Sequence, residues 1–155
     1  MVGVDGSAGS LRALRWALEE ATLRRAALQA VMVWRGVEAD DETAFEFATF
    51  RSLAGYDRGA ATLAGEHLRD LLSEALGEAA GRVEPIVLEG HPVDALCEHA
   101  TGADLLVVGS RGHGAVAEVL LGSVSAACAR RSPCPLVVVP GRRGRRAAAP
   151  GRVPR

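Results

Sequence analysis

The sequence contains no lysine, few aromatic side chains and no long apolar run. Without lysine, the phosphate-binding pattern GxxxxGK[ST] is excluded, because its lysine must reach the distal phosphates. Aromatic residues make up only 4% of the 155 residues, so a core must be built from valine, leucine and alanine. No apolar stretch approaches the ~20 residues that span a bilayer, and no signal-peptide pattern opens the chain. We therefore expect a cytoplasmic, single-domain protein that does not enter a membrane.

The three cysteines, Cys97, Cys128 and Cys134, include no CxxC pair, and each sits among apolar neighbours. A cysteine in such surroundings behaves as a small hydrophobic residue. We expect free thiols in a reducing compartment, and a metal or redox site is the less favoured alternative.

Positive charge is concentrated at the carboxyl end of the chain. Residues 1–140 hold 12 arginines against 19 acidic residues, whereas residues 141–155 hold six arginines and no acidic residue. An acidic body argues against nucleic acid as the main partner. The tail has too few apolar side chains to fold alone. We predict one domain over residues 1–140, followed by a disordered arginine-rich tail over residues 141–155. A tail that touches nucleic acid or membrane phosphates is the less favoured alternative.

Short apolar segments alternate with helical periodicities along the chain. Strands are expected near residues 1–4, 28–34, 83–88, 105–108 and 135–139, with helices over 11–21, up to about 77, after Pro92 and over 123–131. Ser10 is the expected N-cap of the first helix. Strands that alternate with helices indicate βαβ units. The predicted fold is α/β, a doubly wound five-stranded parallel sheet with helices on both faces.

Glycines and serines follow the fourth expected strand, where a doubly wound sheet places its ligand crevice. Gly109-Ser110-Arg111-Gly112-His113-Gly114 comes first, and Leu121-Gly122-Ser123-Val124-Ser125 opens the last helix. Glycines let the backbone approach an anion closely, and a helix N-terminus adds free amides and a positive dipole end. This pattern indicates a phosphate-binding segment. A glycine-rich turn before an ordinary serine-capped helix is the alternative.

The spacing Gly109-x2-Gly112-x9-Gly122-Ser123 resembles the nucleotide-binding motif G-x2-G-x9-G-[ST] of the universal stress protein family. The resemblance extends to residues 2–7, to Gly90-His91-Pro92, and to residues 103–112 and 132–139. It implies a Rossmann-like fold of the adenine nucleotide alpha hydrolase-like type. It also implies an adenine-nucleotide-binding stress-response regulator, with ATP as the expected nucleotide, whose interactions with partners depend on that nucleotide.

The resemblance also implies roles for individual residues. Asp5 matches an acidic residue near the ribose and adenine, and Val33 matches the position whose backbone meets the adenine edge. Gly109 matches the ribose-side glycine, and the phosphate-binding positions are Gly112, Gly122, Ser123, Val124 and Ser125. Second-rank binding candidates are Val4, Val108, Arg111 and His113. A simple Asx turn is the alternative for Asp5, and a solvated loop position is the alternative for Arg111 and His113.

Catalytic groups are poorly specified by this segment. Phosphoryl transfer usually needs a lysine or arginine clamp, a metal-holding carboxylate and a positioned base or water. The segment offers at best Arg111 and His113, so we assign no catalytic residue and expect binding rather than catalysis. Two alternatives stay open: a slow Mg-dependent ATPase in which Asp5 helps to hold Mg²⁺, and a dimeric scaffold that binds no nucleotide.

Three further expectations concern the periphery of the domain. Pro135 to Val139 is a wholly apolar edge strand, which is an association hazard unless it is paired. The resemblance implies antiparallel pairing of this strand across a two-fold axis, and hence a homodimer. The strand that opens at Val2 is shorter than in family members, so we expect the native chain to begin upstream of Met1. The acidic stretch from Glu38 to Glu46 is expected to be an ordinary loop, with a flap over the crevice as the alternative.

Overall fold

Strands and helices alternate throughout the part of the chain that the computed structural model describes, which is residues 1–34, 57–112 and 121–141. The elements are β1 (Val2–Gly3), α1 (Ala8–Arg24), β2 (Leu28–Trp34), α3 (Asp57–Leu76), the 3-10 helix η2 (Gly77–Arg82), β3 (Val83–Glu89), α4 (Pro92–His99), β4 (Leu106–Gly109), α5 (Ser123–Arg131) and β5 (Leu136–Val139). Their order matches the predicted alternation. His113, the stretch from Glu38 to Glu46 and residues 142–155 lie outside the described residues, so the predictions for them are not addressed.

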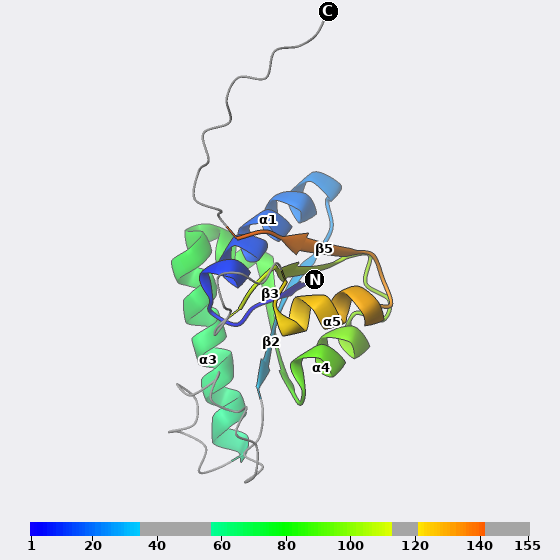
Figure 1. Cartoon of the computed structure of the whole chain (residues 1–155). Helices are drawn as coiled ribbons and strands as arrows, with labels where there is room; N and C mark the ends of the chain where they lie inside the picture. Colours follow the sequence, from blue (N-terminus) through cyan, green and yellow to red (C-terminus); the bar gives the residue numbers. More distant parts are fainter. Residues whose placement is uncertain (35–56, 113–120, 142–155) are drawn as a thin grey trace, which may run out of the picture.

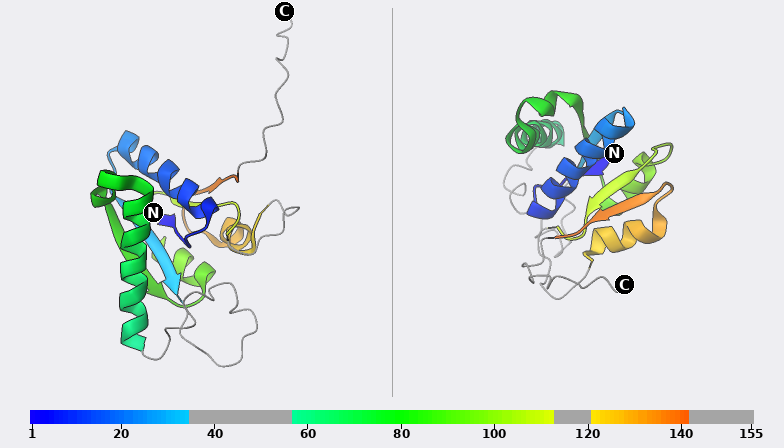
Figure 2. Two further views of the ribbon diagram at one scale, coloured as in Figure 1. Left: turned by 90° about the vertical axis from the view of Figure 1, so that its left-hand side faces the viewer. Right: turned by 90° about the horizontal axis from the view of Figure 1, so that it is seen from above.

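The five strands form one parallel sheet in the order β3-β2-β1-β4-β5. Helices α1 and α3 cover one face of this sheet, and α4 and α5 cover the other (Figures 1 and 2). The predicted doubly wound α/β fold is therefore confirmed. Strand order reverses between β1 and β4, which places the switch point of the topology at their carboxyl ends.

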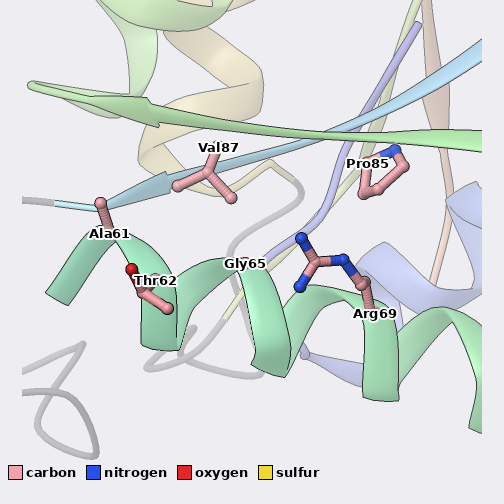
Figure 3. A pocket seen from close by; sticks show the side chains of 6 residues that line it. All are labelled: Ala61, Thr62, Gly65, Arg69, Pro85 and Val87. Atoms are coloured by element: carbon pink, nitrogen blue, oxygen red, sulfur yellow. The ribbon is translucent and has the colours of Figure 1, made fainter. Parts of the chain in front are cut away.

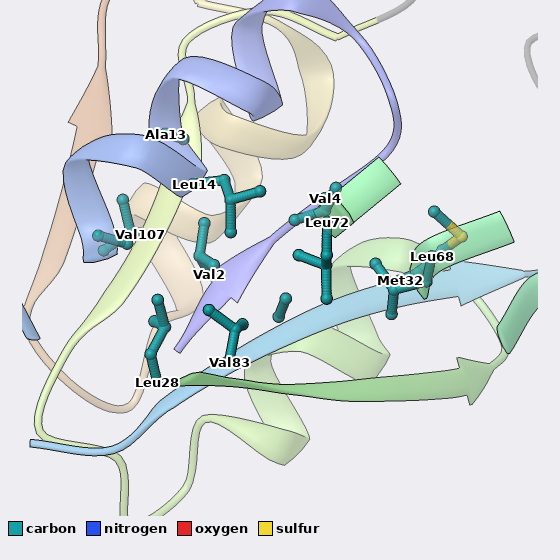
Figure 4. Close-up of a cluster of buried hydrophobic side chains, with 12 residues drawn as sticks. Val2, Val4, Ala13, Leu14, Leu28, Met32, Leu68, Leu72, Val83 and Val107 are labelled. Carbon is teal, nitrogen blue, oxygen red and sulfur yellow. The ribbon is translucent and has the colours of Figure 1, made fainter. Parts of the chain in front are cut away.

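Side chains of the central strands are buried on both faces of the sheet. On β2, Ala30 and Met32 pack towards α1 and α3, whereas Val31 and Val33 pack towards α4. Figure 4 shows the first of these clusters, in which Leu14 of α1 meets the strands. Each fully buried valine or leucine contributes about 1.5–3 kcal/mol. This two-sided burial explains why β4, and β2 from Ala30 onward, are continuous apolar runs rather than alternating ones.

The central strand β1 is only two residues long, yet hydrogen bonds continue on either side of it. The amino group of Met1 donates to the Leu105 carbonyl at 2.8 Å, and Val107 N donates to the Met1 carbonyl at 2.9 Å. Val4 N donates to the Val31 carbonyl at 2.9 Å. Residues 1–4 are therefore bonded to both neighbouring strands, and the upstream start stays a prediction.

The predicted N-cap of α1 is wrong by three residues. The helix begins at Ala8, and Ser7 is its cap, with extended backbone angles (φ −67°, ψ 154°) and a hydroxyl oxygen that accepts from Ser10 N at 3.2 Å. Ser10 lies inside the first turn, where its hydroxyl donates to the Ser7 carbonyl at 3.0 Å. The prediction failed because Gly9 is a poor helix former, although its close approach to the Arg111 carbonyl leaves no room for a side chain there.

No helix among residues 1–34, 57–112 and 121–141 combines the length and the apolar character that a membrane crossing needs.

Candidate functional site

Two helices begin at the switch point of the sheet. Helix α1 follows β1, and α5 follows β4 after the loop of the glycine motif. The two strands are neighbours, and their helices lie on opposite faces of the sheet. Both helix N-termini therefore flank the carboxyl ends of β1 and β4, where a doubly wound fold binds its ligand.

Gly109 and Gly9 let the start of α1 pack directly on the end of β4. A Cβ at Gly109 would lie 2.8 Å from the Gly9 carbonyl carbon and 3.0 Å from Ser10 N. A Cβ at Gly9 would overlap the Arg111 carbonyl oxygen. The need for glycine at position 109 is thus explained by packing within the protein, and its predicted contact with a ribose stays a prediction. Gly9 was not among the predicted site residues. Its only indication in the sequence is that it is a small residue beside a serine.

Asp5 and Gly112 lie in direct contact beyond the carboxyl ends of β1 and β4. A Cβ at Gly112 would overlap Asp5 Oδ2, so only glycine permits this approach. The other carboxylate oxygen of Asp5, Oδ1, accepts from Ser7 N at 2.9 Å. The Asx-turn alternative for Asp5 is therefore present, and it is compatible with a binding role. One oxygen fixes the side chain, and the second lies against the glycine motif.

The start of α5 is anchored to the end of β4 through Ser110. Gly122 N donates to the Ser110 carbonyl at 2.7 Å. The Ser125 hydroxyl is within 3.0 Å of the same carbonyl and of the Gly122 carbonyl, and Ser125 is 2% exposed. A hydroxyl has one proton, which Ser125 uses within the protein. Ser125 therefore holds the loop in place in this structure, and its direct contact with a phosphate stays a prediction.

Helix α5 has no side-chain cap among the residues that the structure describes. Its N-cap is Gly122, with extended angles (φ −69°, ψ 167°) and no side-chain capping hydrogen bond. The first intrahelical hydrogen bond runs from Ala126 N to the Gly122 carbonyl at 2.9 Å. The amides of Ser123, Val124 and Ser125 consequently have no acceptor within the helix. No acidic side chain stands in this turn, so the positive end of the helix dipole is available to an anion.

The three valine candidates contribute backbone rather than side chain to this region. Val4 and Val108 are each 4% exposed, and Val33 is 7% exposed, all with side chains in the core. Val33 of β2 pairs with Leu88 of β3. Strand β2 lies beside β1, on the side away from β4. A ligand that extends from Val33 to the α5 N-terminus must therefore cross the end of β1, where Asp5 stands.

A separate hollow lies away from these residues, between α3 and β3 (Figure 3). It has a volume of about 310 Å³ and is lined by Ala61, Thr62, Gly65, Arg69, Pro85 and Val87. None of the predicted site residues lines it. The sequence pattern of α3 did not predict this hollow, because the hollow forms where Gly65 leaves space against the edge strand β3.

The thiols are packed on the α4 and α5 side of the sheet. Cys97 and Cys128 are buried and Cys134 is half-buried, and all three are free. Burial, reinforced by the neighbouring Cys97 thiol, raises the pKa of Cys128 to about 12. Cys128 is therefore a protonated core residue at neutral pH.

Comparison with protein families and curated sequences places these features among known proteins. A family model described as the universal stress protein family matches residues 1–140. A universal stress protein of Mycobacterium tuberculosis is 35% identical over 151 residues, a match that covers 90% of this chain and 47% of that protein. The chain thus spans about half the length of the curated relatives that it matches.

Solved structures give the same picture of the fold. The crystal structure of a universal stress protein in complex with cAMP is 34% identical, with a TM-score of 0.57, over 89% of this chain and 92% of that one. A universal stress protein family protein of Arabidopsis thaliana with AMP bound is 24% identical, with a TM-score of 0.56, over 96% and 95% of the two chains. At that lower identity the likeness concerns the fold alone.

Proposed function

The chain belongs to the universal stress protein family, and on that premise we propose that it binds an adenine nucleotide, ATP, at the switch point between β1 and β4. The observation that carries the proposal is the uncapped N-terminus of α5, opposite Asp5 and Gly112. Support also comes from the related protein that is 34% identical and was solved in complex with cAMP.

In this proposal the phosphates lie at the first turn of α5. The amides of Ser123, Val124 and Ser125 donate to phosphate oxygens, and the helix dipole favours their negative charge. Ser123 is exposed, so its hydroxyl is available as a further donor. Gly112 and Gly122 present backbone without a Cβ, which allows the phosphates to approach closely.

The nucleoside end lies towards β2 in the same proposal. Asp5 Oδ2 accepts hydrogen bonds from ribose hydroxyls, while Oδ1 stays with Ser7 N. The backbone at Val33 then meets the edge of the adenine. Because Asp5 is held by its own turn before any ligand arrives, little side-chain entropy is lost on binding.

We extend the proposal to the role and assembly of the protein. A bound nucleotide that spans β2 to α5 makes the carboxyl edge of the sheet differ between bound and free forms, which suits a stress-response regulator. The edge strand β5, whose four residues are half-buried, pairs with its counterpart in a homodimer. A measurement of molecular mass in solution, with and without ATP, tests the homodimer.

The experiment starts from protein purified without added nucleotide. The protein is denatured, the supernatant is chromatographed for adenine nucleotides, and phosphate release with Mg²⁺ is followed over hours. Co-purified ATP with negligible turnover supports the proposal. Steady turnover that Gly122→Val abolishes supports the slow ATPase instead. Finding no bound nucleotide, together with no binding of added ATP or AMP, leaves the dimeric scaffold.

The Gly122→Val variant needs a matched control. A Cβ at Gly122 would meet the Arg111 Cα and the Ser110 carbonyl oxygen at 3.5 Å, an ordinary contact distance, so the Cβ itself introduces no clash. Gly81→Val introduces the same side chain in η2, where a Cβ meets nothing within 4 Å. Loss of nucleotide binding in the first variant and its retention in the second is the expected result.

A further inference from the structure

Two arginine side chains meet just beyond β5, beside the proposed phosphate positions. Arg12 comes from the second turn of α1, and Arg111 comes from the loop after β4. A Cβ at Gly141 would lie 3.4 Å from Arg12 Nη2 and 3.6 Å from Arg111 Nη2. The two guanidinium groups therefore converge on one point, which glycine leaves open.

The Arg12 guanidinium is only partly satisfied. Its Nε atom is buried and has no hydrogen-bond partner within the part of the chain that the structure describes. A buried donor without a partner is unfavourable, and such a group in a folded protein calls for an explanation. The forked N–H groups of arginine match two oxygens of a phosphoryl group, so an oxyanion beside Arg12 would remove this cost.

Hydrogen bonds at the ends of β4 and β5 hold the backbone at Gly141, the point on which the two guanidinium groups converge. Ser110 N donates to the Val139 carbonyl at 2.8 Å, and Gly141 N donates to the Ser110 hydroxyl at 3.0 Å. The carbonyl of the same Ser110 accepts from Gly122 N at the start of α5. Gly141, where the two guanidinium groups converge, and the start of α5 are thus both hydrogen-bonded to Ser110, which places the arginine pair near the proposed phosphates.

We propose that Arg12 and Arg111 form an oxyanion site for a phosphoryl group. Two sources share this chemistry. One is the distal phosphate of a nucleotide whose proximal phosphates lie at α5, and this source rests on the proposed function. The other is free inorganic phosphate, which needs no nucleotide. Two converging guanidinium groups favour a multiply charged phosphoryl group over a single carboxylate.

The first test removes the charge of Arg12 by the Arg12→Gln substitution. Its control is Arg15→Gln, which loses the same charge from an exposed side chain of the same helix, where Arg15 Nε donates to the Ala75 carbonyl at 3.3 Å. Dissociation constants for ATP and AMP are measured at matched ionic strength on the full chain. Arg12→Gln is expected to weaken ATP binding at least about tenfold and to leave AMP binding unchanged. Arg15→Gln is expected to change neither.

A second pair of variants tests the site without removing an arginine. The backbone of Gly141 is not in the left-handed region, so a side chain is tolerated there. Gly141→Asp places a carboxylate at the point where the two guanidinium groups converge, and Gly141→Asn places a neutral side chain of the same shape there. The rise in melting temperature produced by inorganic phosphate or tripolyphosphate, against chloride at equal ionic strength, is expected to vanish in Gly141→Asp and to persist in Gly141→Asn.

The outcomes separate the two sources and the two proposals. If Arg12→Gln lowers the preference for ATP over AMP and Arg15→Gln does not, the group bound at the oxyanion site is the distal phosphate of the nucleotide. An unchanged preference, with a phosphate-dependent melting temperature that needs Arg12, assigns free phosphate. If neither quantity depends on Arg12 or on the charge at position 141, the oxyanion site is wrong. If no nucleotide binds, the proposed function fails, and the tripolyphosphate measurement still decides the oxyanion site.

Discussion

Helices α1 and α5 both begin at the carboxyl edge of the sheet, yet their N-termini differ in capping. Helix α1 is capped by the hydroxyl of Ser7. Its first turn packs closely against the end of β4 at Gly9. Helix α5 begins at Ser123 after the N-cap Gly122, and within the described ranges it receives no side-chain cap. A capped helix start serves the fold, whereas an uncapped one beside a glycine motif leaves donors for a ligand. Position at the switch point therefore does not by itself distinguish a binding element from a structural one.

The largest effect on stability is expected where α1 touches β4. Gly109→Ala would place a Cβ 2.8 Å from the Gly9 backbone, which cannot move away as a flexible side chain can. We expect a loss of about 3 kcal/mol in the free energy of unfolding. Chemical denaturation measures it. A loss below about 1 kcal/mol would show that the α1 start is not tightly packed.

A side-chain cap introduced at the start of α5 is expected to stabilise the helix and to weaken ATP binding. Gly122→Asp gives the helix an acidic N-cap, which raises the free energy of unfolding by a few tenths of a kcal/mol. The same carboxylate occupies the anion position and repels phosphate, so ATP affinity should fall about a hundredfold, or about 2.7 kcal/mol. Gly122→Asn is the neutral control, with a smaller loss of affinity. Unchanged ATP affinity in Gly122→Asp would remove α5 from the binding site.

Removing the cap of α1 is expected to affect stability alone. Ser7→Ala deletes the hydroxyl oxygen that accepts from Ser10 N. The free energy of unfolding should fall by about 1 kcal/mol. ATP affinity should change by less than about threefold, because Ser7 N still holds Asp5. A large loss of affinity at unchanged stability would make Ser7 part of the binding site.

The smallest effect on the free energy of unfolding is expected from a change in pH. It concerns the buried side chains by which the two helices are packed. Helix α1 buries Ala13, Leu14 and Ala17, whereas α5 buries Ser125 and the Cys128 thiol. Folding raises the pKa of Cys128 from 9.0 to about 12. Its contribution is therefore complete below about pH 9 and is lost as pH rises towards 12, because the unfolded chain releases the proton first. The decline in unfolding free energy between pH 8 and 10 should be smaller in Cys128→Ala; equal declines would contradict the shift.

The fold was predictable because its signals are local and repeated. Runs such as residues 105–108 are apolar throughout, which indicates burial on both faces, and the alternation with helices fixes the doubly wound class. The cap of α1 was not predictable in the same way. Ser7 and Ser10 are both good caps by residue type, and the choice between them depends on Gly9 meeting the Arg111 carbonyl, a contact between distant parts of the chain.

The candidate site was predictable in position and less so in detail. The motif spacing located Gly112 and Gly122, and the structure brings Gly112 to Asp5 as the crevice requires. The inward use of the Ser125 hydroxyl and the meeting of Arg12 with Arg111 were not foreseen. Neither has a signature in residue type or spacing, because both arise from how three strand ends are packed together.

Amide hydrogen exchange at the two helix starts shows whether ATP binds at α5 and not at α1. Exchange rates are compared with and without ATP for the amides of Ser123 and Val124 in α5 and of Ala8 and Gly9 in α1. If phosphates bind at the start of α5, ATP slows exchange at Ser123 and Val124 and leaves Ala8 and Gly9 unchanged. Protection confined to α1, or no protection at α5 under saturating ATP, would contradict binding at α5.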